Sequence, residues 1–203
     1  MNHNLVFGFA LFAAATSVTP GPNNTLLLAA GLNYGVINNW RHIAGINVGF
    51  PVMVLAIGLG LHTLFDEWPI LYSTLRIGGC GYFIYLAWRL ASTPVSSKLE
   101  IPGSERSVRP IGFWSAAGFQ WINPKCWVMA LGACTTYLAA SSTKQDLLTL
   151  AILWGVIGVP CSLVWVGFGK ILSKYLQESR HIISFNRAAA VVLVASLYPL
   201  FIR

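Results

Sequence analysis

The chain reads Thr19-Pro20-Gly21-Pro22-Asn23-Asn24 in the middle of a long apolar stretch. A second apolar stretch is interrupted in the same way by Gln120-Trp121-Ile122-Asn123-Pro124-Lys125, and Pro124 follows Pro22 by 102 residues, about half the chain. Proline removes a backbone donor and clashes with the preceding helical turn, so each motif predicts a helix that stops and starts again. Irregular backbone at membrane depth is tolerated only where protein or a water-filled cavity satisfies its polar groups. A matched pair of broken helices, one in each half, is typical of the binding site of a secondary transporter.

The composition is that of a membrane protein. Of the 203 residues, 56% are hydrophobic and 9% are charged, whereas a soluble domain carries about 25% charged residues. A chain of this length can form about six membrane-spanning helices of about 20 residues each. The formal net charge of +7 does not indicate a nucleic-acid partner, because the basic residues lie in short loops between apolar runs. It indicates orientation in an anionic membrane, with lipid as the partner.

We therefore predict an all-α membrane protein with six transmembrane helices, of which the first and the fourth are broken at the proline motifs. The predicted spans cover residues 5–32, 43–65, 69–91, 111–139, 147–169 and 186–202. Residues 92–110 hold three prolines and five serines, which predicts a flexible linker between a first three-helix repeat, 1–91, and a second, 111–203.

The basic residues predict the orientation of the spans. The loops on one side of the membrane collect nine of them, Arg41, Arg89, Lys98, Arg106, Arg109, Lys170, Lys174, Arg180 and Arg187, whereas the other side has only Lys144 and Arg203. An excess of lysine and arginine marks cytoplasmic loops, so the linker is predicted to be cytoplasmic and both termini to lie outside. With three spans in each half, the second half enters the membrane from the opposite face, which makes an inverted repeat.

The two breaks also predict the binding residues. A half-helix that begins at a break presents free amide groups, which suit a carboxylate, and one that ends there presents free carbonyls, which suit an ammonium group. Together these ends match an amino acid zwitterion. The candidate substrate-binding residues are Thr19, Pro20, Gly21, Pro22, Asn23, Asn24, Asn47, Gln120, Asn123, Pro124 and Lys125. Asn47 lies in the second span between Gly45 and Gly49, and we expect it to hydrogen-bond to the first break.

Few charged residues fall within the predicted spans. All six acids lie in loops or at span ends, so no membrane carboxylate is predicted to bind a metal ion or to carry a proton, and no cofactor is expected. Lys125 lies near the middle of the fourth span, where a charge is costly unless it is paired or hydrated. It either holds a substrate carboxylate, exchanges a proton, or extends along its helix to the interface. We take Arg76, Lys125 and Cys126 as candidate gate or coupling residues.

Several segments resemble the lysine-exporter (LysE/RhtB type) family of bacterial amino acid exporters. They are Thr19 to Asn24, Gly78-Gly79-Cys80-Gly81-Tyr82 with Tyr85-Leu86-Ala87-Trp88-Arg89, Asn123-Pro124-Lys125, and Asn186-Arg187. The stretches 44–50 and 111–114 are most similar to the branch that exports cysteine and O-acetylserine. The resemblance implies a multi-pass secondary transporter of the bacterial inner membrane that exports small neutral amino acids or derivatives, such as cysteine, O-acetylserine or threonine, driven by the proton motive force. Many members carry an acid after the glycine of the second span, but Phe50 follows Gly49 here, which fits a non-cationic substrate.

Other interpretations stay open at this point. A transporter of small ions or other metabolites would use the same broken helices. An intramembrane thiol relay would use Cys126, but Asn24 rather than a cysteine lies at the equivalent position of the first break. An enzyme is not predicted, because Ser115 and Lys125, ten residues apart, would lie about 15 Å from each other on a continuous helix. The G-x-x-x-G of Gly45 and Gly49 serves close packing either within one bundle or in a homo-oligomer.

Overall fold

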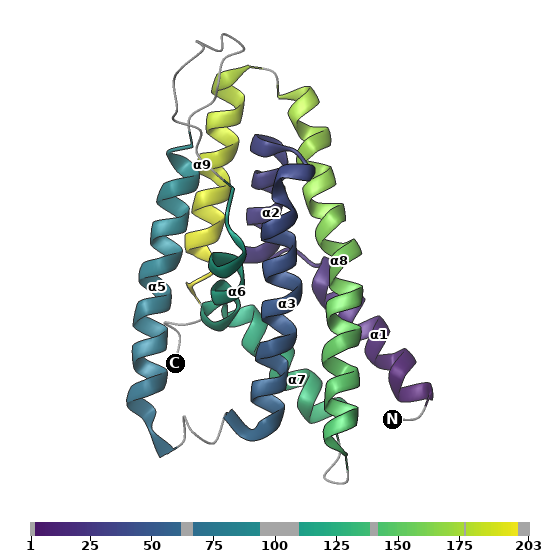
Figure 1. Ribbon diagram of the computed structural model, residues 1–203. Helices are drawn as coiled ribbons and strands as arrows, with labels where there is room; N and C mark the ends of the chain where they lie inside the picture. Colours follow the sequence, from purple (N-terminus) through teal and green to yellow (C-terminus); the bar gives the residue numbers. More distant parts are fainter. Residues whose placement is uncertain (1–2, 62–66, 94–109, 139–141, 177, 199–203) are drawn as a thin grey trace.

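The computed structural model describes residues 3–61, 67–93, 110–138, 142–176 and 178–198, and every regular element in them is a helix. The helices are α1 (His3–Val18), α2 (Pro22–Tyr34), α3 (Trp40–Ala56), α5 (Pro69–Ala91), α6 (Phe113–Ile122), α7 (Pro124–Tyr137), α8 (Lys144–Tyr175) and α9 (Ser179–Ala195), with the short turns η1 (Ile37–Asn39) and η2 (Ile57–Leu61) on either side of α3. They form one upright bundle (Figure 1). The all-α prediction is confirmed for these residues.

Some of the helices meet the requirements of a membrane span. The continuous stretches Ile37–Leu61 and Lys144–Tyr175 are long and apolar enough to cross a membrane, and α1 with α2 passes the same test as a bent pair. Large apolar side chains on the outside of α8, such as Val156 and Phe168, are exposed, which suits a surface that faces lipid. The full set of six spans stays a prediction.

Both predicted breaks are confirmed. α1 ends at Val18 and α2 begins at Pro22, with a bend of 57° between their axes. α6 ends at Ile122 and α7 begins at Pro124, with Asn123 between them. Each proline is the first residue of its helix, where its missing N–H is harmless because a first-turn amide has no partner within the helix.

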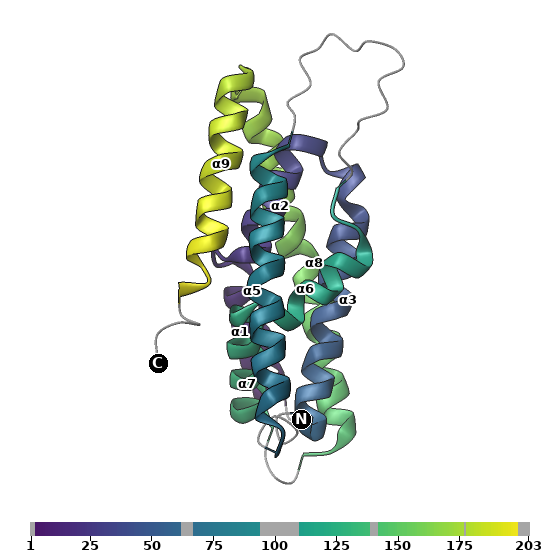
Figure 2. The ribbon, with the colours of Figure 1, turned by 90° about the vertical axis from the view of Figure 1, so that its left-hand side faces the viewer.

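The two broken pairs run in opposite directions through the bundle. Figure 1 shows α1 and α2 rising from the N-terminus, whereas α6 and α7 descend, so that the two breaks meet at about mid-height. The most extensive helix contacts are those of α2 with α8 and of α3 with α6. α5 and α9 pack against each other at one edge of the bundle (Figures 1 and 2).

Glycines allow the closest of these contacts. A Cβ on Gly49 would lie 2.5 Å from the Cα of Ala117, and one on Gly45 would lie 2.7 Å from the Cβ of Ala116, so the G-x-x-x-G of α3 packs against α6 within the bundle. Gly31 and Gly169 serve the contact between α2 and α8 in the same way, because a Cβ on either would overlap backbone of the other helix. Close packing within the chain therefore accounts for the G-x-x-x-G motif.

The last helix differs from its prediction. α9 runs from Ser179 to Ala195, whereas the predicted span begins at residue 186 and ends at 202. Residues 179–187 include Arg180, His181, Asn186 and Arg187, so the helix begins before the apolar run from which the span was predicted. Residues 199–202 of the predicted span lie outside the described part. Arg76 lies within α5, and its side chain is also outside the part that is described.

Candidate functional site

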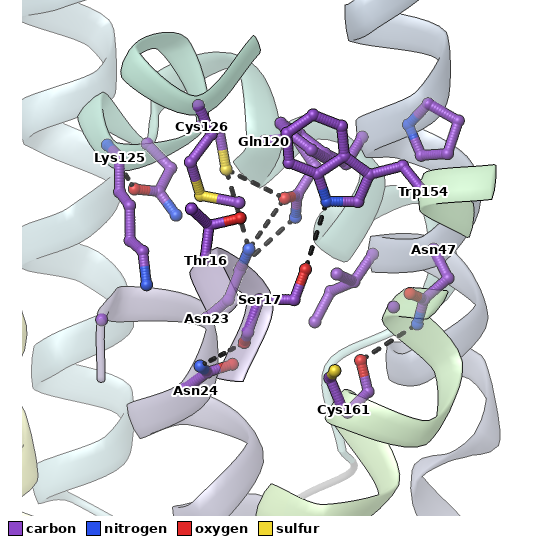
Figure 3. Close-up of a pocket in the computed structure, with 18 residues that line it drawn as sticks. Thr16, Ser17, Asn23, Asn24, Asn47, Gln120, Lys125, Cys126, Trp154 and Cys161 are labelled. Atoms are coloured by element: carbon purple, nitrogen blue, oxygen red, sulfur yellow. Dashed lines mark hydrogen bonds between the residues drawn. The ribbon is translucent and has the colours of Figure 1, made fainter. Parts of the chain in front are cut away.

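A cavity lies where the two broken helices meet (Figure 3). Its volume is about 50 Å³. Its walls come from α1, α2, α3, α6, α7 and α8. The predicted residues that line it are Gly21, Asn23, Asn24, Asn47, Gln120, Asn123, Lys125 and Cys126. Thr19, Pro20, Pro22 and Pro124 belong to the breaks but are not part of the lining.

A reciprocal pair of amides joins the two breaks. The Nδ2 of Asn23 donates to the Oε1 of Gln120 at 2.8 Å, and the Nε2 of Gln120 donates to the Oδ1 of Asn23 at 3.2 Å. Gln120 is fully buried, and it also donates to the Ala116 carbonyl at 2.7 Å and accepts from the Cys126 thiol at 3.2 Å. A buried amide needs such partners, and these hold the side chain in one orientation at the cavity wall.

Lys125 bridges from the second break to the first. Its Nζ donates to the Thr19 carbonyl at 2.8 Å, to the Thr19 hydroxyl at 2.9 Å and to the Pro20 carbonyl at 3.3 Å. In Figure 3 the side chain leaves α7 and reaches down to the break between α1 and α2. The lysine therefore does not extend along its helix to an interface. Its charge lies among carbonyl oxygens, which stabilise a cation.

The expected free carbonyls at the end of α1 are not found, so this prediction is wrong for the conformation described. Besides Lys125, the Nδ2 of Asn24 donates to the carbonyls of Ser17 at 2.8 Å and of Thr19 at 2.7 Å. The indole of Trp165 donates to the Val18 carbonyl at 3.1 Å. Polar side chains on the break and on facing helices therefore satisfy these carbonyls.

The two half-helices that begin at the breaks present their amides differently. The Oδ1 of Asn123 accepts from the backbone N of Lys125 at 3.1 Å and so caps α7. At the start of α2, Gly21 offers no side-chain cap. First-turn amides lack partners within a helix, so the start of α2 is the better place for an anion.

Asn47 reaches a different partner from the one predicted. Its Nδ2 donates to the Ile43 carbonyl at 2.8 Å and to the hydroxyl of Ser162 on α8 at 3.0 Å. Gly158 makes room for it, because a Cβ there would overlap the Asn47 side chain. Asn47 thus lines the cavity from α3 as predicted, but it hydrogen-bonds to α8 and not to the first break.

One wall of the cavity is aromatic. Trp154 is buried, donates its indole N–H to the Ser17 hydroxyl at 3.1 Å, and packs edge-on against Phe50 with ring centroids 4.8 Å apart. Phe50, where the family resemblance leads us to expect an acid, therefore forms part of an apolar wall. Sequence reasoning missed Ser17, Trp154 and Ser162, although small polar residues beside the first break and beside Pro160 were a usable signal.

A second reciprocal amide pair lies outside this cavity. The Nδ2 of Asn33 donates to Asn186 at 2.9 Å, and the Nδ2 of Asn186 donates back at 3.1 Å. The pair joins α2 to α9, and it gives a structural function to the Asn186-Arg187 segment noted in the sequence.

Comparison with known proteins agrees with these features. Residues 14–200 match the family described as LysE type translocator. A protein of Salmonella choleraesuis (strain SC-B67) named cysteine/O-acetylserine efflux protein is 31% identical over 180 residues, covering 88% of this chain and 89% of its own. Proteins of the same name from Klebsiella pneumoniae and Escherichia coli O1:K1 / APEC are 27% and 29% identical, and they cover 96% and 100% of this chain, and 97% and 98% of their own lengths.

No solved structure matches the chain significantly. Because the family match runs through nearly the whole chain, this protein belongs to the LysE type translocator family, whose members are transporters and not enzymes.

Proposed function

We propose that this protein is a secondary transporter that exports small neutral amino acids or their derivatives, of the cysteine, O-acetylserine or threonine kind, across the bacterial inner membrane. One observation carries the proposal: helix breaks from both halves of the chain line a single cavity. Its described lining residues include amides, hydroxyls and the Lys125 ammonium, but no acid. The names of the relatives support the same substrate class.

The cavity suits a small zwitterion. The substrate carboxylate would lie at the start of α2, near the backbone amides of Asn23 and Asn24, with the Lys125 ammonium as its countercharge. The limited volume favours substrates of a few heavy atoms beyond the glycine core. A lysine or arginine substrate would bring a second cation into a cavity that has no carboxylate in its described lining to pair with it.

Two inverted repeats, 1–91 and 111–203, joined by 92–110, would place this cavity near the midplane. The opposite directions of α1–α2 and α6–α7 support this arrangement (Figure 1). The contacts of α3 with α8 and of α5 with α9 also support it, because each pairs equivalent helices of the two repeats, as expected of helices that lie beside a two-fold axis.

The orientation we propose has a cytoplasmic linker and external termini. The end of α5 that carries Arg89 and the end of α8 that carries Lys170 and Lys174 lie together at one end of the bundle (Figure 1). Lys144 lies at the opposite end of α8. This distribution of charge supports a cytoplasmic location for the first end.

The proposal is tested with inverted membrane vesicles that contain the protein and a pH-sensitive dye. Labelled cysteine, O-acetylserine, threonine, leucine, lysine and arginine are added separately, with and without an imposed pH gradient. We expect the small neutral compounds to enter the vesicles and to move protons, and lysine and arginine to do neither. Equal movement of lysine, or no movement of any compound above vesicles without the protein, would overturn the proposal.

A further inference from the structure

The turn between α1 and α2 surrounds an ammonium group with oxygens. The carbonyl and hydroxyl of Thr19 and the carbonyl of Pro20 all lie within 3.3 Å of the Lys125 Nζ. The lysine stem crosses directly over Gly21, because a Cβ on that residue would lie 2.8 Å from the Lys125 Cδ and 3.1 Å from its Nζ. The turn, the glycine and the lysine therefore fit together as one unit, which we call the ammonium cage (Thr19, Pro20, Gly21).

The chemistry of the ammonium cage matches a primary ammonium group. Such a group has three N–H donors and no acceptor, and the cage offers three oxygens. Two of these are carbonyls just beyond the end of α1, where the helix dipole is negative and favours a cation. The α-ammonium of an amino acid is the same chemical group as the end of a lysine side chain, so the cage does not distinguish between them by hydrogen bonding.

We propose that the ammonium cage is a binding site that Lys125 fills when no substrate is present, and that the α-ammonium of the transported amino acid takes its place. This inference rests on the proposed function and specifies how its substrate is held. The displaced Lys125 ammonium then pairs with the substrate carboxylate, so the zwitterion lies between lysine and cage. Binding in this way replaces the direct link between the two breaks by a link through the substrate, and the direct link forms again when the substrate leaves.

The direct test uses ethylammonium, which carries the charged end of lysine without its backbone. Lys125→Ala empties the cage, so ethylammonium should bind this variant and raise its unfolding temperature in detergent in a saturable way. We expect ethylammonium to bind the variant at least about tenfold more tightly than it binds the wild type, because the empty cage offers charge-assisted hydrogen bonds. Tetramethylammonium, which has no N–H donors, should have no such effect. The control variant Lys170→Ala, changed at an exposed site, should respond as the wild type does. The proposal would be overturned if ethylammonium does not raise the unfolding temperature of Lys125→Ala. If Lys125→Ala cannot be purified, the same measurement is made on Lys125→Ser.

Gly21→Ala gives an independent test. The backbone of Gly21 is extended, with φ 176° and ψ 178°, which alanine also adopts, so the main consequence of the new Cβ is its collision with the lysine stem. We expect Gly21→Ala to lower the unfolding temperature of the wild type and to have no further effect in Lys125→Ala. An equal effect in both backgrounds would contradict the proposed fit.

Export by the wild type separates this inference from the proposed function. Wild-type export of small neutral amino acids, with no response of Lys125→Ala to ethylammonium, would refute the ammonium cage but support the proposed function. A response of Lys125→Ala to ethylammonium without any wild-type export would support the cage but refute the proposed function.

Discussion

Substitution of the amide pair between the two breaks distinguishes an effect on transport from an effect on stability. Asn23→Ala removes both hydrogen bonds to Gln120, of 2.8 and 3.2 Å. A polar hydrogen bond between membrane helices contributes about 0.6 kcal/mol on average and about 1.7 at most. Gln120 keeps its bonds to Ala116 and Cys126 in the variant, so no buried amide loses all its partners. We therefore expect a loss of about 1–2 kcal/mol in the free energy of unfolding.

Asn33→Ala is the matched control, because it removes a reciprocal pair of nearly the same lengths, 2.9 and 3.1 Å. Its partner Asn186 is fully buried, and among the residues that the structure describes it has no other side-chain hydrogen bond. The stranded amide adds its own penalty, so we expect a loss of about 2–3 kcal/mol, at least as large as that of Asn23→Ala.

Transport should follow the opposite order. We expect Asn23→Ala to lower the initial rate of export by at least about tenfold, which corresponds to about 1.4 kcal/mol at the transport step, whereas Asn33→Ala retains most of the wild-type rate. The free energy of unfolding is measured by reversible unfolding in mixed micelles. The export rate is measured as efflux from proteoliposomes, normalised to reconstituted protein. Export that falls in proportion to stability in both variants would refute the assignment of Asn23 to the binding site.

Three further predictions extend the account. Gly49→Ala places a Cβ 2.5 Å from the α6 backbone and should lower the free energy of unfolding by about 1–3 kcal/mol. The control Gly132→Ala, whose Cβ would have nothing within 4 Å, should be neutral or stabilising. A neutral Gly49→Ala would contradict the close packing of α3 on α6. Thr143→Ala removes the capping box of α8 and should cost about 1 kcal/mol with unchanged export per folded molecule, so a specific transport defect would be unexpected. Ser162→Ala removes the hydroxyl that accepts a 3.0 Å hydrogen bond from Asn47. It should weaken the apparent substrate affinity about threefold, as measured by concentration-dependent efflux. An unchanged affinity would place Asn47 outside the site.

Local sterics explain what the sequence predicts well. Proline favours a break because it lacks an N–H and clashes with the preceding turn, and Pro22 and Pro124 each lie at a break among polar residues. Proline alone does not decide the outcome, since Pro51 and Pro160 lie within the continuous helices α3 and α8. Closely spaced glycines such as Gly45 and Gly49 indicate a close helix contact, but they do not say which helix makes it. The structure identifies α6 as that helix.

Partners far apart in the sequence are the part that could not be predicted. Lys125 and Thr19 are separated by 106 residues, and their contact depends on how the two halves of the chain pack against each other. Asn47 bonds to Ser162, 115 residues away, because the rotation of α3 turns it toward α8. The expectation of free carbonyls failed for a simpler reason, since Asn24 in the same motif already satisfies two of them.

Binding of a small neutral amino acid between the breaks can be measured most directly at Cys161. This cysteine is half-buried and lines the cavity, whereas Cys134 is half-buried and does not belong to the lining. Each is retained as the only cysteine of the protein, the others being changed to serine, and its rate of reaction with a small maleimide is measured. We expect O-acetylserine to slow the modification of Cys161 at the concentrations that drive export, to leave Cys134 unaffected, and lysine to protect neither. A rate at Cys161 that O-acetylserine does not change while export is saturated would show that the substrate binds elsewhere.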